Sequence, residues 1–196
     1  AFTPGDPAAP LPASANNDFP VILVHGLGGG PGESTFGKLQ EYLEDFYYTV
    51  EVMDFNEYNG KKFARGNDAG NLGTQAAALG NFIQDVLKKH NAERVNIIAH
   101  SYGGLIVHAD LNNFGVEYDK KKGGFDDNVG RVFYIQVPFY GSYADEDTLT
   151  ELIEATDYGR YLNVKEMLDT LQVGSESVYL LDKATRENNV YSYVDA

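Results

Sequence analysis

The sequence predicts an α/β fold in which a mostly parallel sheet is covered on both faces by helices. Short apolar runs rich in β-branched residues alternate along the chain with longer segments whose apolar residues recur at helical spacing. Such alternation is typical of parallel sheets, whose strands are buried on both faces and therefore read as continuous apolar runs. A length of 196 residues suits one domain with a sizeable core.

The first half of the chain predicts two strands and two helices. Residues 21–24 form a continuous apolar run, and residues 48–52 alternate as in a more exposed strand. Between them, residues 34–46 predict an amphipathic helix. A polar loop over residues 55–70 leads into a second, longer helix. The apolar face of the first helix comprises Phe36, Leu39, Leu43 and Phe46, and that of the second comprises Leu72, Ala76, Leu79, Ile83, Val86 and Leu87.

The second half continues the alternation. Residues 95–98 predict a buried strand, and the residues that follow Ser101 have helical spacing. A charged, glycine-containing loop over residues 114–128 separates this helix from a further strand at residues 132–137.

Ser101 lies at the predicted junction of a strand and a helix, with Ala99 two residues before it and Gly103 two residues after it. A strand that turns sharply into a helix crowds its own backbone, so only small residues fit at these two flanks. The serine at the apex takes strained dihedral angles, and its hydroxyl projects above the helix N-terminus. This is the pattern of a nucleophile elbow, here with Ala99 where glycine is commoner.

A glycine-rich loop, His25-Gly26-Leu27-Gly28-Gly29-Gly30, follows the first predicted strand. Glycines after a buried strand allow backbone N–H groups to face a ligand. Combined with the elbow, the loop predicts an oxyanion hole formed by the backbone amides of Leu27 and Tyr102. An ordinary glycine-rich turn is the alternative.

Net charge and composition exclude several classes of binding partner and reactive site. The net charge of −14 argues against binding to nucleic acid or to an anionic membrane surface. Solubility explains this charge most simply, with calcium binding or a salt-rich habitat as alternatives. The absence of cysteine excludes disulfides, a thiolate nucleophile and a thiolate metal site. No apolar run reaches about 18 residues, so no transmembrane segment is expected.

The Pro-rich residues 1–12 begin without methionine and resemble the mature end of a chain from which a signal peptide has been removed. We therefore expect a secreted protein, with a trimmed recombinant chain as the alternative.

Three motifs resemble those of bacterial lipases and esterases of the α/β-hydrolase superfamily, in the same order and with similar spacing. They are VHGLGG at residues 24–29, AHSYGG at residues 99–104 and VPFYGS at residues 137–142, where Phe139 replaces the family's histidine. Residues 174–181 are similar to the Gly-Ser-x-x-Leu stretch of these lipases.

The resemblance implies a serine carboxylic-ester hydrolase that acts on an ester or lipid and needs no cofactor or metal for its chemistry. It assigns Ser101 as the nucleophile. The strand that ends at Asp195 is similar to the family strand whose terminal aspartate is the acid of the triad.

We divide the chain accordingly into an extended N-terminal arm at residues 1–18, an α/β-hydrolase core at residues 19–142, a helical segment at residues 143–189 and an acid-bearing strand of the core at residues 190–196. The helical segment lies where hydrolases insert a cap, so it is expected either to line an acyl pocket or simply to pack as short helices.

The mechanism also needs a base within hydrogen-bond reach of the serine. Family order places this histidine after the acid, but only Ala196 follows Asp195. None of the four histidines in the chain is expected to serve, because of where each lies. His25 is in the oxyanion loop, His90 ends a distant helix, His100 precedes the serine at a tight turn, and His108 is about 10 Å along the following helix.

We therefore expect that the chain lacks a C-terminal part that carries the histidine, and that this part was removed or is bound as a second polypeptide. An unpaired apolar edge at the strand of residues 190–196 would otherwise invite aggregation, which supports a missing piece. The alternatives are a divergent member that binds without hydrolysis, and a histidine supplied by a different protein.

The sequence thus predicts a lipase or carboxylesterase that forms an acyl-enzyme on Ser101, and that as this chain alone hydrolyses little or nothing. The alternative functions are a non-catalytic binding module with a hydrolase fold, and an acyltransferase or amidase that uses the same elbow.

Overall fold

Strands and helices alternate along the whole described part of the chain. The structure is a computed structural model, and it describes residues 19–26, 36–55, 72–112 and 128–141. The elements, in chain order, are β1 (Val21–Val24), α1 (Gly37–Asp45), β2 (Val50–Val52), α2 (Leu72–His90), β3 (Val95–His100), α3 (Tyr102–Leu111) and β4 (Val129–Ile135). The predicted alternation is confirmed.

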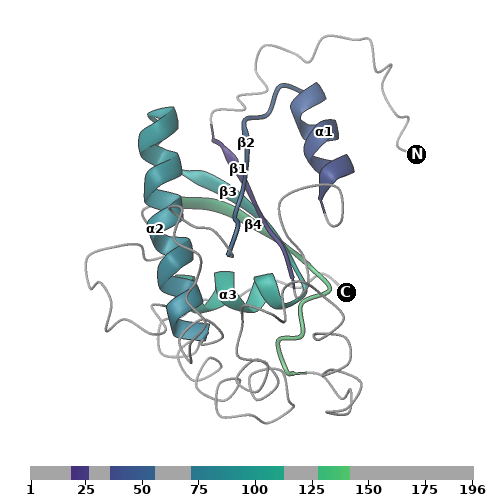
Figure 1. Cartoon of the computed structure of the whole chain (residues 1–196), viewed down its shortest axis with the longest axis vertical. Coiled ribbons are helices and arrows are strands. Elements are labelled where there is room, and N and C mark those ends of the chain that lie inside the picture. The colour runs from purple at the N-terminus through teal and green to yellow at the C-terminus, as the bar shows by residue number, and fades with distance from the viewer. Residues whose placement is uncertain (1–18, 27–35, 56–71, 113–127, 142–196) are drawn as a thin grey trace.

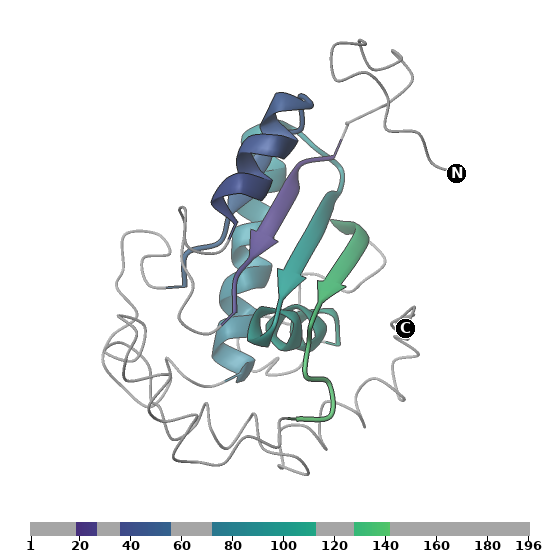
Figure 2. The ribbon, with the colours of Figure 1, turned by 90° about the vertical axis from the view of Figure 1, so that its right-hand side faces the viewer.

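The four strands form one parallel sheet in the order β2-β1-β3-β4. Figure 2 shows β1, β3 and β4 side by side. From β1 the chain moves to one side to form β2, and then returns to the other side to form β3. The side of the sheet on which new strands are added changes between β1 and β3, and at this switch point Val24 is in register with Ala99. Open parallel sheets bind ligands outside the carboxyl ends of their strands at such a switch point.

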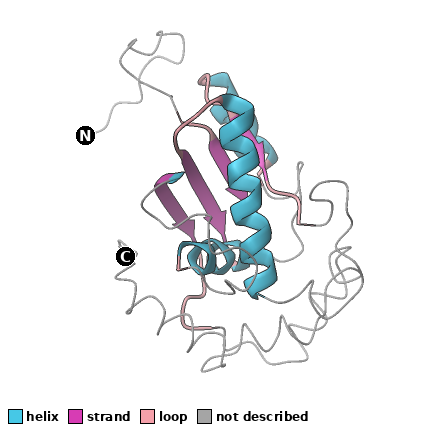
Figure 3. Ribbon diagram, turned by 90° about the vertical axis from the view of Figure 1, so that its left-hand side faces the viewer, coloured by secondary structure: helices cyan, strands magenta, loops and turns pink. Residues whose placement is uncertain are grey.

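Helices cover both faces of this sheet, α1 on one side and α2 with α3 on the other (Figures 1 and 3). The side chains of β1 alternate between the two layers, as the period of a strand requires. Val21 and Leu23 pack with Phe36 on the α1 side, and Ile22 and Val24 join the larger cluster on the α2 side. The prediction of a sheet covered on both faces is therefore confirmed.

Helix α2 spans the face of the sheet and packs against α3. All six apolar positions predicted for it are buried. Lys88, Lys89 and His90 lie in its last turn, where positive charge is favoured by the helix dipole.

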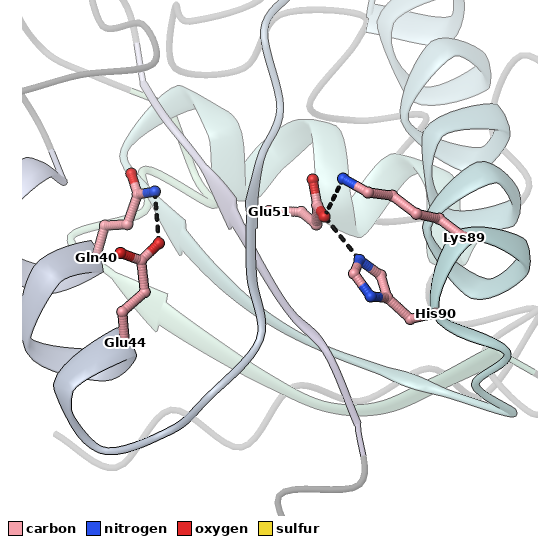
Figure 4. Close-up of polar contacts among 5 residues, drawn as sticks. All are labelled: Gln40, Glu44, Glu51, Lys89 and His90. Carbon is pink, nitrogen blue, oxygen red and sulfur yellow. Dashed lines mark hydrogen bonds and ion pairs between the residues drawn. The ribbon is translucent and has the colours of Figure 1, made fainter.

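Glu51 of β2 ties the sheet to the end of α2 (Figure 4). Its Oε1 accepts hydrogen bonds from Lys89 Nζ at 2.6 Å and from His90 Nε2 at 2.7 Å. Burial alone would raise the pKa of Glu51, but the contacts with Lys89 and His90 outweigh it and hold the pKa below its ordinary value. A second pair in the same view, Gln40 and Glu44 at 2.9 Å, lies within α1.

Several element boundaries differ from the prediction: α1 ends at Asp45 rather than at residue 46, and β2 begins at Val50 rather than at residue 48. Strand β4 runs from Val129 to Ile135 rather than over residues 132–137, because Gln136 has a φ of 50° that ends the extended conformation. Met53 and Phe55 are buried in the core, although residues 55–70 were expected to begin a polar loop.

The predicted arm at residues 1–18, helical segment at residues 143–189 and strand at residues 190–196 all lie outside the described residues. Within the described residues, no helix has both the length and the apolar character needed to span a membrane.

Candidate active site

Ser101 is the single residue between β3 and α3. Its dihedral angles, φ 52° and ψ −129°, are rarely adopted by a residue that carries a side chain and cost about 1–3 kcal/mol. Two backbone hydrogen bonds hold the turn. The Ser101 N–H donates to the carbonyl of Ile135 at 2.9 Å, and the Ser101 carbonyl accepts from the N–H of Gly104 at 2.9 Å. The sharp strand-to-helix turn that an elbow requires is present at this serine.

Gly26 lies directly against the side chain of Ser101. A Cβ atom on Gly26 would be 2.7 Å from Ser101 Cβ and 3.3 Å from Ser101 Oγ. The register of β1 with β3 explains this, because both residues come two positions after the paired residues Val24 and Ala99. The loop after β1 therefore starts beside the serine hydroxyl. Leu27, whose amide is a predicted oxyanion donor, lies outside the described residues.

The glycines after Ser101 are required by close packing. A Cβ on Gly103 would overlap the carbonyl oxygen of His25 and lie 2.7 Å from that of Val24. A Cβ on Gly104 would overlap the methyl groups of Val137. The first turn of α3 thus touches both the end of β1 and the segment after β4, which leaves no room for larger residues.

Tyr102 is the first residue of α3 and is fully buried. Its hydroxyl donates a hydrogen bond of 2.9 Å to Oε1 of Gln75 in α2. Backbone N–H groups in the first turn of a helix point along its axis away from the helix body, where they favour negative charge. The amide of Tyr102 has the position expected of an oxyanion donor, and that role stays a prediction.

His25 is buried at the end of β1. Its Nδ1 lies 2.9 Å from the carbonyl oxygen of Gly26, and its ring packs edge-on against Phe55 with centroids 5.5 Å apart. Burial lowers the pKa of His25, against the smaller opposing effects of the Gly26 bond and of Asp54. The imidazole is therefore neutral near pH 7 and is placed to hold Gly26 beside Ser101.

The remaining histidines have other surroundings. His90 bonds Glu51 near the amino ends of the strands, and the ring of His100 faces Phe36 with centroids 6.5 Å apart. Among the described residues, no hydrogen bond joins any imidazole to Ser101.

His108 lies on α3 within a group of three aromatic rings. Its centroid is 6.3 Å from that of Tyr134 and 5.2 Å from that of Phe139, and these two rings are themselves 5.0 Å apart. Burial lowers the pKa of His108 to about 4. Phe139, which follows β4, thus packs against an imidazole from another element.

Asp195, the predicted acid, lies outside the described residues. Within the described ranges, no group of three or more His, Asp or Glu side chains could hold a metal ion.

The sequence did not single out Gln75, although a signal was available. Gln75 falls on the apolar stripe of α2, three residues after Leu72 and four before Leu79, and all three are buried. A polar residue on such a stripe must find a buried partner, which here is Tyr102.

Comparison with known proteins now decides the family. Residues 14–192 match the family described as "Putative serine esterase (DUF676)". The chain belongs to this family. Membership in DUF676 supports an ester-hydrolase function.

Solved structures support the same fold. The mature form of Bacillus licheniformis lipase BlEst2 aligns with 94% of this chain and 63% of its own, at 16% identity and a TM-score of 0.52. Phospholipase PlaB from Legionella pneumophila aligns with 90% of this chain and 38% of its own, at 19% identity and a TM-score of 0.62. The chain therefore has the α/β-hydrolase fold, and it spans less than two thirds of either neighbour.

Proposed function

We propose that this DUF676 member is a serine carboxylic-ester hydrolase of the lipase or esterase type that works through an acyl-enzyme on Ser101. The observation that carries the proposal is the strained turn at Ser101 together with the contact between Gly26 and its side chain. Strain of this kind persists where the surrounding structure enforces it, and it is concentrated at functional sites. A protein that only binds ligands has no need of it.

In the first step, Ser101 Oγ attacks the ester carbonyl carbon and loses its proton to a base. The carbonyl π electrons move to oxygen, and this oxyanion accepts hydrogen bonds from the amides of Leu27 and Tyr102, each worth about 3 kcal/mol in the transition state. The C–O bond to the alcohol then breaks, and the alcohol leaves with the proton. In the second step water takes the place of the alcohol. It attacks the acyl carbonyl carbon while the base accepts its proton, and the bond to Ser101 Oγ then breaks, which releases the carboxylic acid and returns the proton to the serine.

The base in this proposal is a histidine that is oriented by Asp195 and supplied from outside the present sequence. The positions of His25, His90 and His108 support this, since their rings are engaged at Gly26, at Glu51 and in the aromatic group of α3. Oxyanion stabilisation and binding alone leave about 10³–10⁴-fold acceleration over water when a triad member is missing. A weak activity of this chain is therefore expected.

Chemical rescue tests both parts of the proposal. Hydrolysis of p-nitrophenyl butyrate is measured with and without added imidazole, for the wild type and for Ser101→Ala. We expect a slow wild-type rate that rises with imidazole to saturation, and no rate above the protein-free control for the variant. A wild-type rate that imidazole leaves unchanged would show that the chain supplies its own base. Equal rates for wild type and Ser101→Ala would overturn the nucleophile.

A further inference from the structure

We propose that Gln75 is a positioning residue for the oxyanion hole and that it acts through the side chain of Tyr102. The inference rests on the proposed function, since it concerns the donor amide next to Ser101. It is carried by the buried hydrogen bond of 2.9 Å from the Tyr102 hydroxyl to Gln75 Oε1.

This bond joins the first turns of two helices. Gln75 belongs to the first turn of α2 and Tyr102 opens α3, and both side chains are almost completely buried, at 1% and 0% exposure. The residues are 27 positions apart in sequence. The contact therefore fixes α3, at the end that carries Ser101, relative to the long helix beneath it.

A polar pair at this place is costly compared with an apolar one. Glutamine is seldom fully buried, and an amide removed from water loses its solvent hydrogen bonds. Nε2 of Gln75 is also buried and has no hydrogen-bond partner among the described residues. A leucine at position 75 would avoid these costs, but it could not accept a hydrogen bond. The pair thus supplies a directional contact that ordinary packing of α2 on α3 would not.

Tyr102 is the only side chain among the first three residues of α3, because residues 103 and 104 are glycines. Leu105, which follows them, is buried in the core cluster but is apolar, so in this turn Tyr102 alone can hydrogen-bond to a neighbouring helix through its side chain. The amide of Tyr102 belongs to the same residue as the anchored ring. A catalytic hydrogen-bond donor has to be held within about 0.5 Å of its working position. Anchoring the ring limits the movement of this amide relative to Ser101 and to Gly26.

The test compares variants that remove, keep or replace the bond. Tyr102→Phe removes the hydroxyl, Gln75→Leu removes the acceptor, and Gln75→Glu keeps a carbonyl or carboxylate oxygen as acceptor. Tyr134→Phe is the matched control, because it deletes another buried tyrosine hydroxyl, on a side chain that packs against the core cluster. For each variant, the rate of Ser101 modification by a fluorophosphonate and the kcat and KM for p-nitrophenyl butyrate are measured, together with the thermal midpoint.

We expect Tyr102→Phe and Gln75→Leu each to lower kcat and the modification rate by about tenfold or more. KM should stay within about twofold, because an oxyanion donor stabilises the transition state and not the bound substrate. The double variant should be no slower than the slower single variant, because both remove the same bond. Gln75→Glu and Tyr134→Phe should stay within about threefold of the wild type.

Two results overturn the inference in distinguishable ways. A wild-type chain that is not modified at Ser101 even with added imidazole overturns the proposed function, and the inference with it. Wild-type modification with Tyr102→Phe reacting at the wild-type rate overturns the inference alone, even when that variant has a lower thermal midpoint, because the bond would then be purely structural.

Discussion

The α-carbon of Gly26 faces the side chain of Ser101 so closely that a methyl group on Gly26 would lie 2.7 Å from Ser101 Cβ. The two residues follow the carboxyl ends of the neighbouring strands β1 and β3, at the switch point of the sheet. A side chain at residue 26 would therefore displace the side chain of Ser101 or the backbone beside it. The glycine therefore matters to the chemistry proposed at Ser101 as well as to the turn.

Gly26→Ala should lower kcat/KM for p-nitrophenyl butyrate by about 10²-fold, because a shift of about 1 Å at the reacting atoms costs this much. The matched control is Gly130→Ala on β4, where an added Cβ would come no closer than 3.0 Å to Asn96 Oδ1 and 3.4 Å to Phe19. The control should keep its activity. If both variants are equally active, the contact with Ser101 does not limit the reaction.

Gly104→Ala should destabilise the fold by about 1–3 kcal/mol through overpacking against Val137. Val137→Ala removes the methyl groups that the new Cβ would meet. The double variant should therefore be more stable than the sum of the single effects by about 1 kcal/mol or more. Urea unfolding of the wild type and the three variants measures this coupling, and strictly additive effects would contradict the packing described here.

Asp110→Asn should stabilise the protein at alkaline pH. Burial raises the pKa of Asp110 from 3.8 to about 8, so the folded protein keeps a proton that the unfolded chain releases. The stability that this proton provides is complete in acid and is lost as the pH rises from about 4 through about 8. The variant should match the wild type near pH 4 and melt several degrees higher near pH 9.

Asp85→Asn, which changes the net charge equally from an exposed position of α2, is the control for that experiment. A wild-type melting temperature that is flat between about pH 4 and pH 9 would show that Asp110 is ionised in the folded protein.

His108→Phe should weaken the acid sensitivity of the fold. Burial lowers the pKa of His108 from 6.5 to about 4, so the unfolded chain takes up a proton before the folded protein does. The stability provided by the neutral ring is present above about pH 6.5 and is lost as the pH falls toward 4. Phenylalanine preserves an aromatic ring beside Tyr134 and Phe139 without this titration.

The readout for His108→Phe is the difference in unfolding free energy between about pH 7 and pH 4.5, which should be smaller than in the wild type. His90→Phe, at the half-exposed partner of Glu51, provides the comparison. If His108→Phe leaves this difference in unfolding free energy unchanged, residues other than His108 cause the acid sensitivity of the fold.

Local sequence patterns were sufficient to predict the elements of the described core. All four residues of β1 are buried, which gives a continuous apolar run, and one face of α2 is buried, which gives apolar residues at helical spacing. Both patterns can be recognised in the sequence. The predicted end of the last strand, residue 137, was wrong because nothing in the residue type of Gln136 indicates its left-handed φ. Burial of Phe55 was missed because it results from packing against His25, which is distant in sequence.

The turn at Ser101 was also predictable, because its flanking small residues carry the steric requirement in the sequence itself. The contact between Gly26 and Ser101 depends on the register of β1 with β3, and the bond between Gln75 and Tyr102 depends on how α2 packs on α3. Both are long-range relationships that no local pattern specifies. The roles of Leu27 and Asp195 stay predictions from the resemblance, since neither lies in the described residues.

The most direct test of the account is the site of covalent modification. The chain is treated with a fluorophosphonate, its intact mass is measured, and the modified peptide is sequenced by mass spectrometry. The account predicts a single adduct on Ser101 that is absent from Ser101→Ala. An adduct on another residue, or equal modification of the Ser101→Ala variant, would contradict it.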